Sequence, residues 1–307
     1  MADITTKSIR NIVLLGHGGS GKTSLVETAL YLSKGTDRLG KIADGNTVCD
    51  YDAEEIQRKF SIMLSLAPVM WKDTKINFID TPGFLDFEGE VHSGIRVADA
   101  AIITLDGKAG VEVGTELAWD KATDAGIPRA FFVNKCDDPE ANFDRVYTQL
   151  QEQFGSSVCP VLVPFKTAGT TKFINLIENK IYTFDAKGVR SESDLDGEAQ
   201  AIADNYKDGL NEALASTSEE LLEKYFEEGE LSIEEIKTAL YAFKILALDV
   251  ELESFLETDS NIECLVAFVT ELLDGDVLAD LNAALELHAH LCENFDFGLD
   301  NVLFNTE

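Results

Sequence analysis

The sequence predicts an α/β fold in which a mainly parallel sheet is flanked by helices on both faces. Short apolar segments alternate with helical stretches over the first 154 residues, an order typical of βαβ units. The segment 100–105 is apolar at nearly every position, which indicates a strand buried on both faces, as in parallel sheets. Ligands bind such sheets at the carboxyl ends of the strands.

The first strand and helix of this fold enclose a glycine-rich loop. A short apolar run, residues 12–15, precedes the pattern G-x-x-x-x-G-K-[ST], and apolar residues at helical spacing follow it. This pattern is the phosphate-binding loop: its backbone N–H groups turn toward an anion, and the helix that follows presents its positive end. We expect Lys22 to reach the β and γ oxygens of a nucleotide and Thr23 to ligate Mg²⁺, whereas His17 reads as loop packing. The expected phosphate contacts are Gly16, His17, Gly18, Gly19, Ser20, Gly21, Lys22, Thr23 and Ser24.

Residues 35–61 lack strong periodicity and are predicted to form a long loop, which in a compact domain is usually functional. Two strands, residues 62–71 and 75–79, should follow. Pro68 lies inside the first of them, and proline cannot donate a ladder hydrogen bond, so this strand is predicted to lie at an edge.

A second polar motif, Asp80-Thr81-Pro82-Gly83, follows the strand of residues 76–79 directly. A carboxylate at that end of a strand can hold Mg²⁺ through water, and the backbone N–H of a glycine there can contact the γ-phosphate. We therefore expect Asp80 and Gly83 in the nucleotide site.

A third motif, Asn134-Lys135-Cys136-Asp137, follows the apolar strand of residues 130–133. A carboxylate at Asp137 can accept two hydrogen bonds from the N1 and N2 edge of guanine, whereas adenine has no matching donor pair. Lys135 would cover the ring with its stem, and Asn134 would tie this loop to the phosphate loop. The motif predicts selection of guanine.

With these three motifs in order, the chain resembles the GTP-binding domain of the translational GTPases, in particular elongation factor G and its paralogues. The resemblance spans roughly residues 8–245. It implies a Ras-like GTPase domain with GTP or GDP and Mg²⁺ as cofactors, a ribosomal partner, and a cycle of GTP binding and hydrolysis that orders switch loops. The matching stretches are residues 16–25, 80–83, 86–87, 96–100, 106–111, 132–137, 172–183 and 219–240.

Two parts of the sequence depart from the family pattern near the expected γ-phosphate. Residues 58–61 read Arg-Lys-Phe-Ser where the family usually has Arg-Gly-Ile-Thr, and Ser61 still offers a hydroxyl to Mg²⁺. Phe84 occupies the place of the usual catalytic histidine and has no polar atom to orient water. These differences predict GTP binding with slow hydrolysis; a non-hydrolysing GTP-binding switch stays open as an alternative.

The domains expected from the sequence are a GTP-binding domain (1–166), an acidic insertion (167–244) and an acidic tail (245–307). Within the insertion, residues 173–185 and 196–244 are expected to be helix-rich. The family's closing strand and Ser-Ala guanine contact are not evident in residues 248–254, so the strand 129–133 should be an exposed edge unless residues 262–268 cover it. No Lys or Arg follows Lys244, which raises the hypothesis that the tail is a truncated or frame-shifted product, with a genuine appendage as the alternative.

Charge and cysteine content limit the partners and the compartment. The net charge of −31 resides mostly in the second half of the chain and repels phosphate backbones, so no direct sequence-specific nucleic-acid binding is expected. Five scattered cysteines without a C-x-x-C pair favour a reducing compartment, the cytoplasm. No apolar run has the length of a membrane span. His288, His290 and Cys292 could share a strand face and hold a metal, but their surroundings are typical of a helix, which would scatter them.

Overall fold

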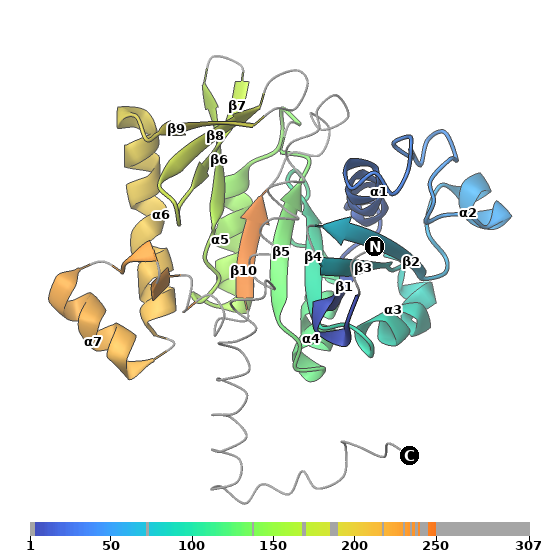
Figure 1. Cartoon of the computed structure of the whole chain (residues 1–307), viewed down its shortest axis with the longest axis horizontal. Coiled ribbons are helices and arrows are strands. Elements are labelled where there is room, and N and C mark those ends of the chain that lie inside the picture. The colour runs from blue at the N-terminus through green and yellow to red at the C-terminus, as the bar shows by residue number, and fades with distance from the viewer. Residues whose placement is uncertain are drawn as a thin grey trace, which may run out of the picture.

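The computed structural model describes residues 4–71, 74–136, 138–167, 170–184, 190–216, 218–229, 231–233, 235–236, 239 and 245–249. A six-stranded sheet in the order β10-β5-β4-β1-β3-β2 forms its centre (Figure 1). Every neighbouring pair is parallel except β2 and β3, so the predicted mainly parallel α/β sheet is confirmed. Its strands are β1 (Ile9–Leu15), β2 (Ser65–Trp71), β3 (Thr74–Asp80), β4 (Ala100–Asp106), β5 (Arg129–Asn134) and β10 (Ile245–Asp249).

The apolar strands lie in the core, as their composition predicts. Ile12, Val13, Leu14 and Leu15 of β1 are each at most 1% exposed, which is the burial expected for a strand with layers on both sides. Strand β2 pairs only with β3 among the described strands and carries Pro68 opposite Asn77. The edge position predicted from Pro68 is thus confirmed.

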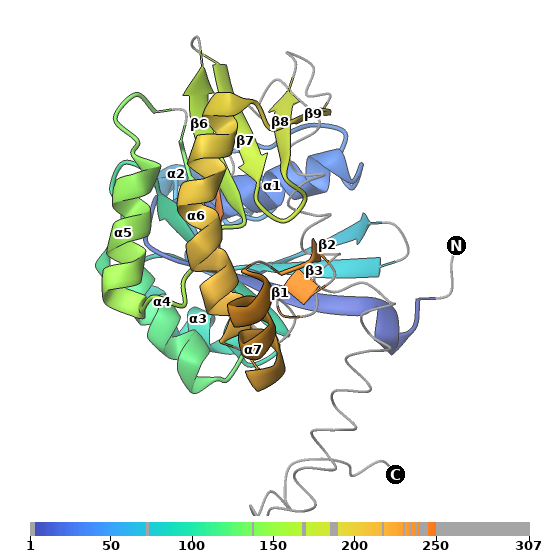
Figure 2. The same cartoon turned by 90° about the vertical axis from the view of Figure 1, so that its left-hand side faces the viewer.

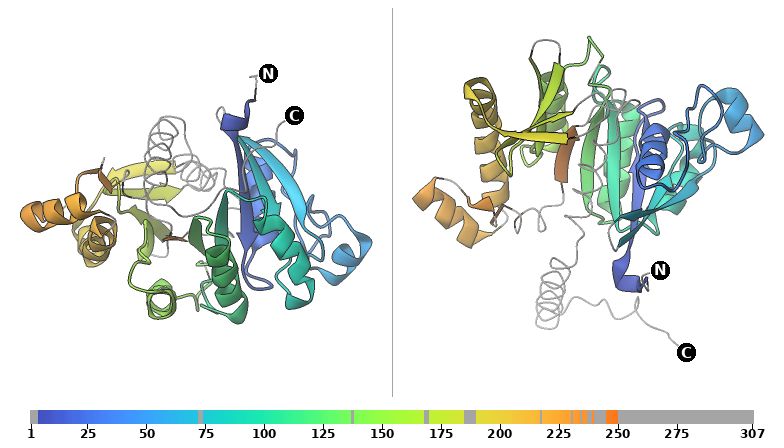
Figure 3. Two further views of the ribbon diagram at one scale, coloured as in Figure 1. Left: turned by 90° about the horizontal axis from the view of Figure 1, so that it is seen from below. Right: turned by 45° about the horizontal axis from the view of Figure 1, so that its top comes forward.

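Helices cover both faces of the sheet because parallel crossovers are right-handed. The chain runs from β1 to β3 in one direction and then from β3 through β4 and β5 in the other. The connection carrying α1 therefore lies on the opposite face from α3, α4 and α5, which lie together in Figure 3 (left). The helices are α1 (Lys22–Leu32), α2 (Ala53–Arg58), α3 (Glu88–Ile95), α4 (Val113–Asp124), α5 (Phe143–Phe154), α6 (Gly197–Ala215) and α7 (Glu219–Glu228), with 3₁₀ turns η1 (Thr6–Ser8) and η2 (Leu85–Phe87).

The segment expected to be one long loop contains a short helix, α2. Asp52 caps it by accepting a hydrogen bond from the backbone N–H of Glu54 (2.8 Å), and the carboxylate of Glu55 accepts one from the N–H of Asp52 (3.1 Å). This reciprocal capping box stabilises a helix too short for periodicity to reveal.

A second sheet of four antiparallel strands, in the order β6-β7-β8-β9, stands beside the main one (Figure 2). Its presence shows that the expectation of a helix-rich segment at 173–185 is wrong. The first strand of this sheet, β6, begins at Leu162, before residue 167. Asn175 explains the difference: its side-chain oxygen accepts hydrogen bonds from the N–H groups of Ile177 and Glu178, both at 2.9 Å, and so turns β7 into β8. The strands are β6 (Leu162–Thr167), β7 (Thr170–Asn175), β8 (Lys180–Phe184) and β9 (Arg190–Asp194).

Helix α6 joins this layer to the main one. The Tyr206 ring lies 6.2 Å from the ring of Phe143 and 5.6 Å from that of Tyr147, both on α5. The Tyr206 hydroxyl also donates a hydrogen bond to the Asp144 carboxylate. The second sheet, α6 and α7 thus lie between α5 and β10 in the chain, and α6 packs on α5 of the main layer.

Strand β10 closes the main sheet, and the expectation that β5 is an exposed edge is wrong. Ile245 pairs with Arg129 and Asp249 with Val133 in a parallel ladder. The strand has only five residues, and only its last two fall within residues 248–254, where no closing strand was evident from the sequence. Its pairing with β5 could therefore be identified only from the tertiary structure. Residue 245 therefore begins a strand of the main sheet and not a separate tail. Residues 262–268, His288, His290 and Cys292 lie outside the described residues.

Candidate functional site

The glycine-rich loop joins β1 to α1 at the carboxyl end of the sheet and closes around Lys22. This side chain is 5% exposed, and its ammonium donates hydrogen bonds to the carbonyl oxygens of Gly16 (3.0 Å) and His17 (2.9 Å). Burial lowers the pKa of Lys22 to about 8, while the charge of Asp80 acts in the opposite direction. A buried, weakly compensated ammonium is a strong attractor for an anion such as phosphate.

Oxygen atoms gather beside this ammonium. The Thr23 and Ser61 hydroxyls lie 3.1 Å apart, although 38 residues separate them. Asp80, at the end of β3, is 1% exposed, and neither of its carboxylate oxygens has a hydrogen-bond partner among the described residues. Burial raises the pKa of Asp80 to about 7, and the nearby Thr23 hydroxyl and the charge of Lys22 oppose this shift.

The unsatisfied carboxylate and the two hydroxyls fit a hard divalent cation. Buried polar atoms are normally paired, and a site of oxygen donors alone suits Mg²⁺. Within the described part of the chain, no group of three or more His, Cys, Asp and Glu side chains has the arrangement of a metal site. A cation here would therefore depend on the hydroxyls of Thr23 and Ser61 together with Asp80, as the motifs predict.

Two further carboxylates near Asp80 were missed from the sequence. Asp50 is 4% exposed and has both oxygens unpartnered within the described residues, and Glu27 is fully buried. Burial raises the pKa of Asp50, and the charges of Asp50 and Glu27 both add to the rise in the pKa of Asp80. One signal was available: Glu27 stands among the apolar residues of the first helix, where a carboxylate needs a partner. Together these groups give the site a negative potential that favours a cation.

The loops expected to hold the base lie against the glycine-rich loop. The Asn134 amide donates to the Ser20 carbonyl oxygen (2.9 Å), the tie that the sequence predicts. Lys135 donates to the carbonyl oxygen of Gly19 (2.9 Å) and to the carboxylate of Asp106 (2.8 Å). Asp106, at the end of β4, is a contact that sequence reasoning missed, and Asp137 lies outside the described residues.

Glycine is required where these loops meet. A Cβ atom on Gly21, whose φ is 99°, would lie 2.1 Å from the Asn134 side-chain nitrogen, and one on Gly83 would lie 2.5 Å from the Lys22 ammonium. Any larger residue at these positions would displace the polar groups of the site. Gly83 thus brings the second motif against the glycine-rich loop.

Phe84 lies over the glycine-rich loop. Its ring is so close that a Cβ atom added to Gly18 would be 3.2 Å from the ring's Cζ atom. The ring centroid is 4.7 Å from that of Phe60 in an edge-on arrangement, and Phe87 lies 6.4 Å from Phe60. Phe84 is 42% exposed. The face of the site nearest solvent is therefore aromatic.

A cavity of about 250 Å³ opens between these groups. Its lining combines the glycine-rich loop, the loop around Ser61 and the second motif, so it lies where the sequence predicts the phosphates. The lining residues are Gly18, Gly19, Gly21, Lys22, Thr23, Ser24, Ile42, Lys59, Phe60, Ser61, Gly83, Phe84 and Lys135.

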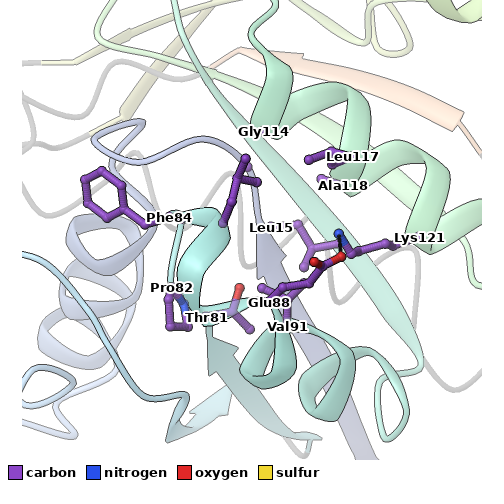
Figure 4. Close-up of a pocket in the computed structure, with 13 residues that line it drawn as sticks. Leu15, Thr81, Pro82, Phe84, Glu88, Val91, Gly114, Leu117, Ala118 and Lys121 are labelled. Carbon is purple, nitrogen blue, oxygen red and sulfur yellow. Dashed lines mark ion pairs between the residues drawn. The ribbon is translucent and has the colours of Figure 1, made fainter.

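A smaller crevice of about 30 Å³ lies behind the second motif, between α3 and α4 (Figure 4). An ion pair between Glu88 and Lys121, 2.7 Å long, spans it, and Phe84 points away from this pair. On the same side, the His17 imidazole Nε2 lies 3.6 Å from the Glu112 carboxylate, and its backbone lies against Gly114. His17 thus packs the loop onto α4, which agrees with its predicted packing role.

Comparison with known proteins identifies the family. A model described as the elongation factor Tu GTP-binding domain matches residues 7–274. The crystal structure of a protein from Thermus thermophilus is similar with a TM-score of 0.79 and 29% identity, covering 88% of this chain and 41% of that protein. The family match continues to residue 274, so the expectation that the resemblance ends at residue 245 is wrong. No helix in the described part of the chain is long and apolar enough to cross a membrane. The chain belongs to the family of the elongation factor Tu GTP-binding domain and contains the GTP-binding domain of a translational GTPase.

Proposed function

We propose that this chain is an elongation factor G-like translational GTPase domain that binds Mg²⁺ with GTP or GDP and hydrolyses GTP slowly. The observation that carries the proposal is the convergence of Lys22, Thr23, Ser61 and Asp80 beside the cavity described above. Lys22 and the loop N–H groups would bind the β- and γ-phosphates. Thr23, Ser61 and Asp80 would hold Mg²⁺, which when bound supplies charge neutralisation at the phosphates.

Hydrolysis needs a second contribution, the orientation of the attacking water. Phe84 occupies the position expected to supply it and presents only carbon atoms. The edge-on contact with Phe60 keeps this ring over Gly18. Turnover should therefore be slow even where binding is tight.

The ribosome is the proposed partner, and the cytoplasm the proposed location. Both follow from the family, because translational GTPases act on ribosomes. The chain spans 41% of the length of the Thermus thermophilus protein.

Nucleotide affinity tests the proposal directly. The protein should bind GTP and GDP in the presence of Mg²⁺ and reject ATP, as measured by competition against a fluorescent guanine nucleotide. Asp137→Asn should shift the preference from GTP toward xanthosine triphosphate, because the side chain would then offer a donor where xanthine offers an acceptor. Equal binding of ATP and GTP by the parent would contradict the assigned base selection.

A second candidate is a GTP-binding switch that does not hydrolyse. The aromatic contact between Phe60 and Phe84 favours it, since the contact joins the two loops without a polar group. Single-turnover hydrolysis with and without ribosomes distinguishes the candidates: a slow, measurable, ribosome-sensitive rate supports the GTPase, and a rate equal to uncatalysed hydrolysis in both cases supports the switch.

A further inference from the structure

The backbone after Ser61 is held by carboxylates. Three consecutive N–H groups donate to them: Ile62 and Met63 to one oxygen of Glu55, at 2.8 and 3.0 Å, and Leu64 to Glu90 at 2.8 Å. Hydrogen bonds to an ionised acceptor are roughly twice as strong as neutral ones. The path of the chain directly after Ser61 is therefore closely constrained.

Glu55 is a buried carboxylate with hydrogen bonds to both of its oxygens. It is 1% exposed, and its second oxygen accepts from the N–H of Asp52 at 3.1 Å. A buried carboxylate is costly unless donors surround it, and here three backbone N–H groups from both ends of the same loop do so. Glu55 thus fastens residue 52, at the start of α2, to residues 62 and 63 beyond its end.

Glu90 comes from a different element. It lies on α3, the helix that follows Phe84 and η2, and its carboxylate accepts the hydrogen bond from the N–H of Leu64. A change in the position of α3 would therefore act on the backbone three residues from Ser61. The two glutamates together hold the backbone that follows Ser61, whose hydroxyl lies 3.1 Å from that of Thr23.

We infer that Glu55 is a positioning residue that holds Ser61 for Mg²⁺, and that Glu90 couples this position to α3. The inference rests on the proposed function, because Ser61 acts on Mg²⁺ only if the site binds Mg·GTP. Neither glutamate lines the cavity described above. Both act through the backbone of residues 62–64.

The test compares variants of Glu55 by the Mg²⁺ concentration at which half of a bound fluorescent GTP analogue is retained. Loss of a group that orients a metal ligand typically costs 10- to 100-fold in metal affinity. Glu55→Ala should therefore raise the half-retention concentration about 10-fold or more. Glu55→Gln keeps an oxygen acceptor and should show a rise of about threefold. The matched control is Glu54→Ala on the same helix, where Glu54 is exposed and pairs with Arg58; this variant should match the parent.

A double-mutant cycle with Ser61→Ala separates positioning from general stability. If Glu55 acts through Ser61, Glu55→Gln should add no further change in the Ser61→Ala background. The shift should also be larger for the GTP analogue than for a GDP analogue, since switch loops are ordered through γ-phosphate and Mg²⁺. The cycle uses Glu55→Gln, so it remains decisive if Glu55→Ala fails to fold.

The outcomes are distinguishable. If the parent binds guanine nucleotides but Glu55→Gln has the same Mg²⁺ midpoint as the parent, the inference is overturned and the proposed function stands. The same holds if Glu55→Gln shifts the midpoint equally in the presence and in the absence of the Ser61 hydroxyl. A parent that binds no guanine nucleotide overturns the proposed function and this inference with it. Glu90→Ala should shift the midpoint in the same direction, whereas Glu90→Gln should retain most of the parental value; equal loss in both would contradict the coupling through Leu64.

Discussion

The two sides of the cavity differ in chemistry. On the inner side Lys22 and Asp80 are buried ionisable groups, and the carboxylate of Asp80 has no hydrogen-bond partner among the described residues. On the outer side Phe84 and Phe60 contact each other edge to face, and Phe84 is partly exposed to solvent. The inner side provides what phosphate and a cation need, while the outer side provides no polar group for water. In this molecule the requirements for binding and for hydrolysis are thus met by different sets of residues, and they can be altered separately.

The largest expected effect comes from restoring a polar group on the outer side. Phe84→His should raise the single-turnover rate of GTP hydrolysis in the presence of ribosomes on the order of a hundred- to a thousandfold, because one oriented polar group is typically worth that much. The affinity for GTP should change little. Phe87→His, in the same aromatic group, is the matched control. A parent already as fast as the histidine variant would mean that another group orients the water.

A somewhat smaller effect is expected from weakening the inner side. Lys22→Ala removes a buried ammonium that would bond to phosphate oxygens. Hydrogen bonds to charged groups contribute about 1.5–3 kcal/mol, so GTP affinity should fall roughly 10- to 150-fold in an equilibrium titration. Lys34→Gln, on an exposed residue shortly after α1, should bind like the parent. An unchanged affinity in Lys22→Ala would place the phosphates elsewhere.

The inner side should also make the nucleotide-free protein sensitive to pH. The pKa of Asp80 rises from its usual value of 3.8 to about 7 on folding, so the folded state binds this proton more tightly than the unfolded chain. Its contribution to stability is complete below the usual pKa and is lost as the pH rises through about 7. The melting temperature should fall between pH 5 and 7.5, a range below the lowered pKa of Lys22.

Asp80→Asn should reduce this pH dependence and raise the melting temperature at pH 7.5 by a few degrees, since about 1 kcal/mol corresponds to roughly 2–4 °C in a protein of this size. A smaller slope should remain, because burial raises the pKa of Asp50 as well. The same variant should need more Mg²⁺ to retain GTP. Thermal melts of parent and variant across the pH range provide the measurement, and parallel curves would show that Asp80 does not titrate there.

The smallest effect is expected where the base should bind. Asp106→Asn leaves Lys135 without its charged partner, 2.8 Å away. Partly exposed ion pairs contribute about 0.2–1 kcal/mol, so the affinity for GTP should fall no more than about fivefold, with hydrolysis per bound nucleotide unchanged. Glu140→Gln, which removes the surface partner of Lys108, should leave the affinity unchanged. A loss of more than tenfold in Asp106→Asn would mean that Asp106 contacts the nucleotide itself.

The sequence alone determined five strands of the main sheet, all except β10, and the positions of the three motifs. Apolar strands followed at once by polar residues place Lys22, Asp80 and Asn134 at the same edge of the sheet, because the carboxyl ends of parallel strands share one edge. Pro68 likewise identified the edge strand, since proline has no backbone N–H to donate to a neighbouring strand. Such inferences depend on covalent spacing and local chemistry, which a sequence contains in full.

Only the tertiary structure decided the contacts between distant segments. Strand β10 is five residues long and acquires its role by pairing with β5. Glu27, Asp50 and Glu55 become buried, and Glu27, Glu55 and Glu90 acquire backbone donors, only when α1, α2 and α3 pack around the loop. Phe84 could be identified from the sequence as a departure from the family pattern. Its place over Gly18 depends on two contacts, that of Gly83 with Gly18 and that of Phe60 with Phe84. These contacts act through space, and no spacing along the chain encodes them.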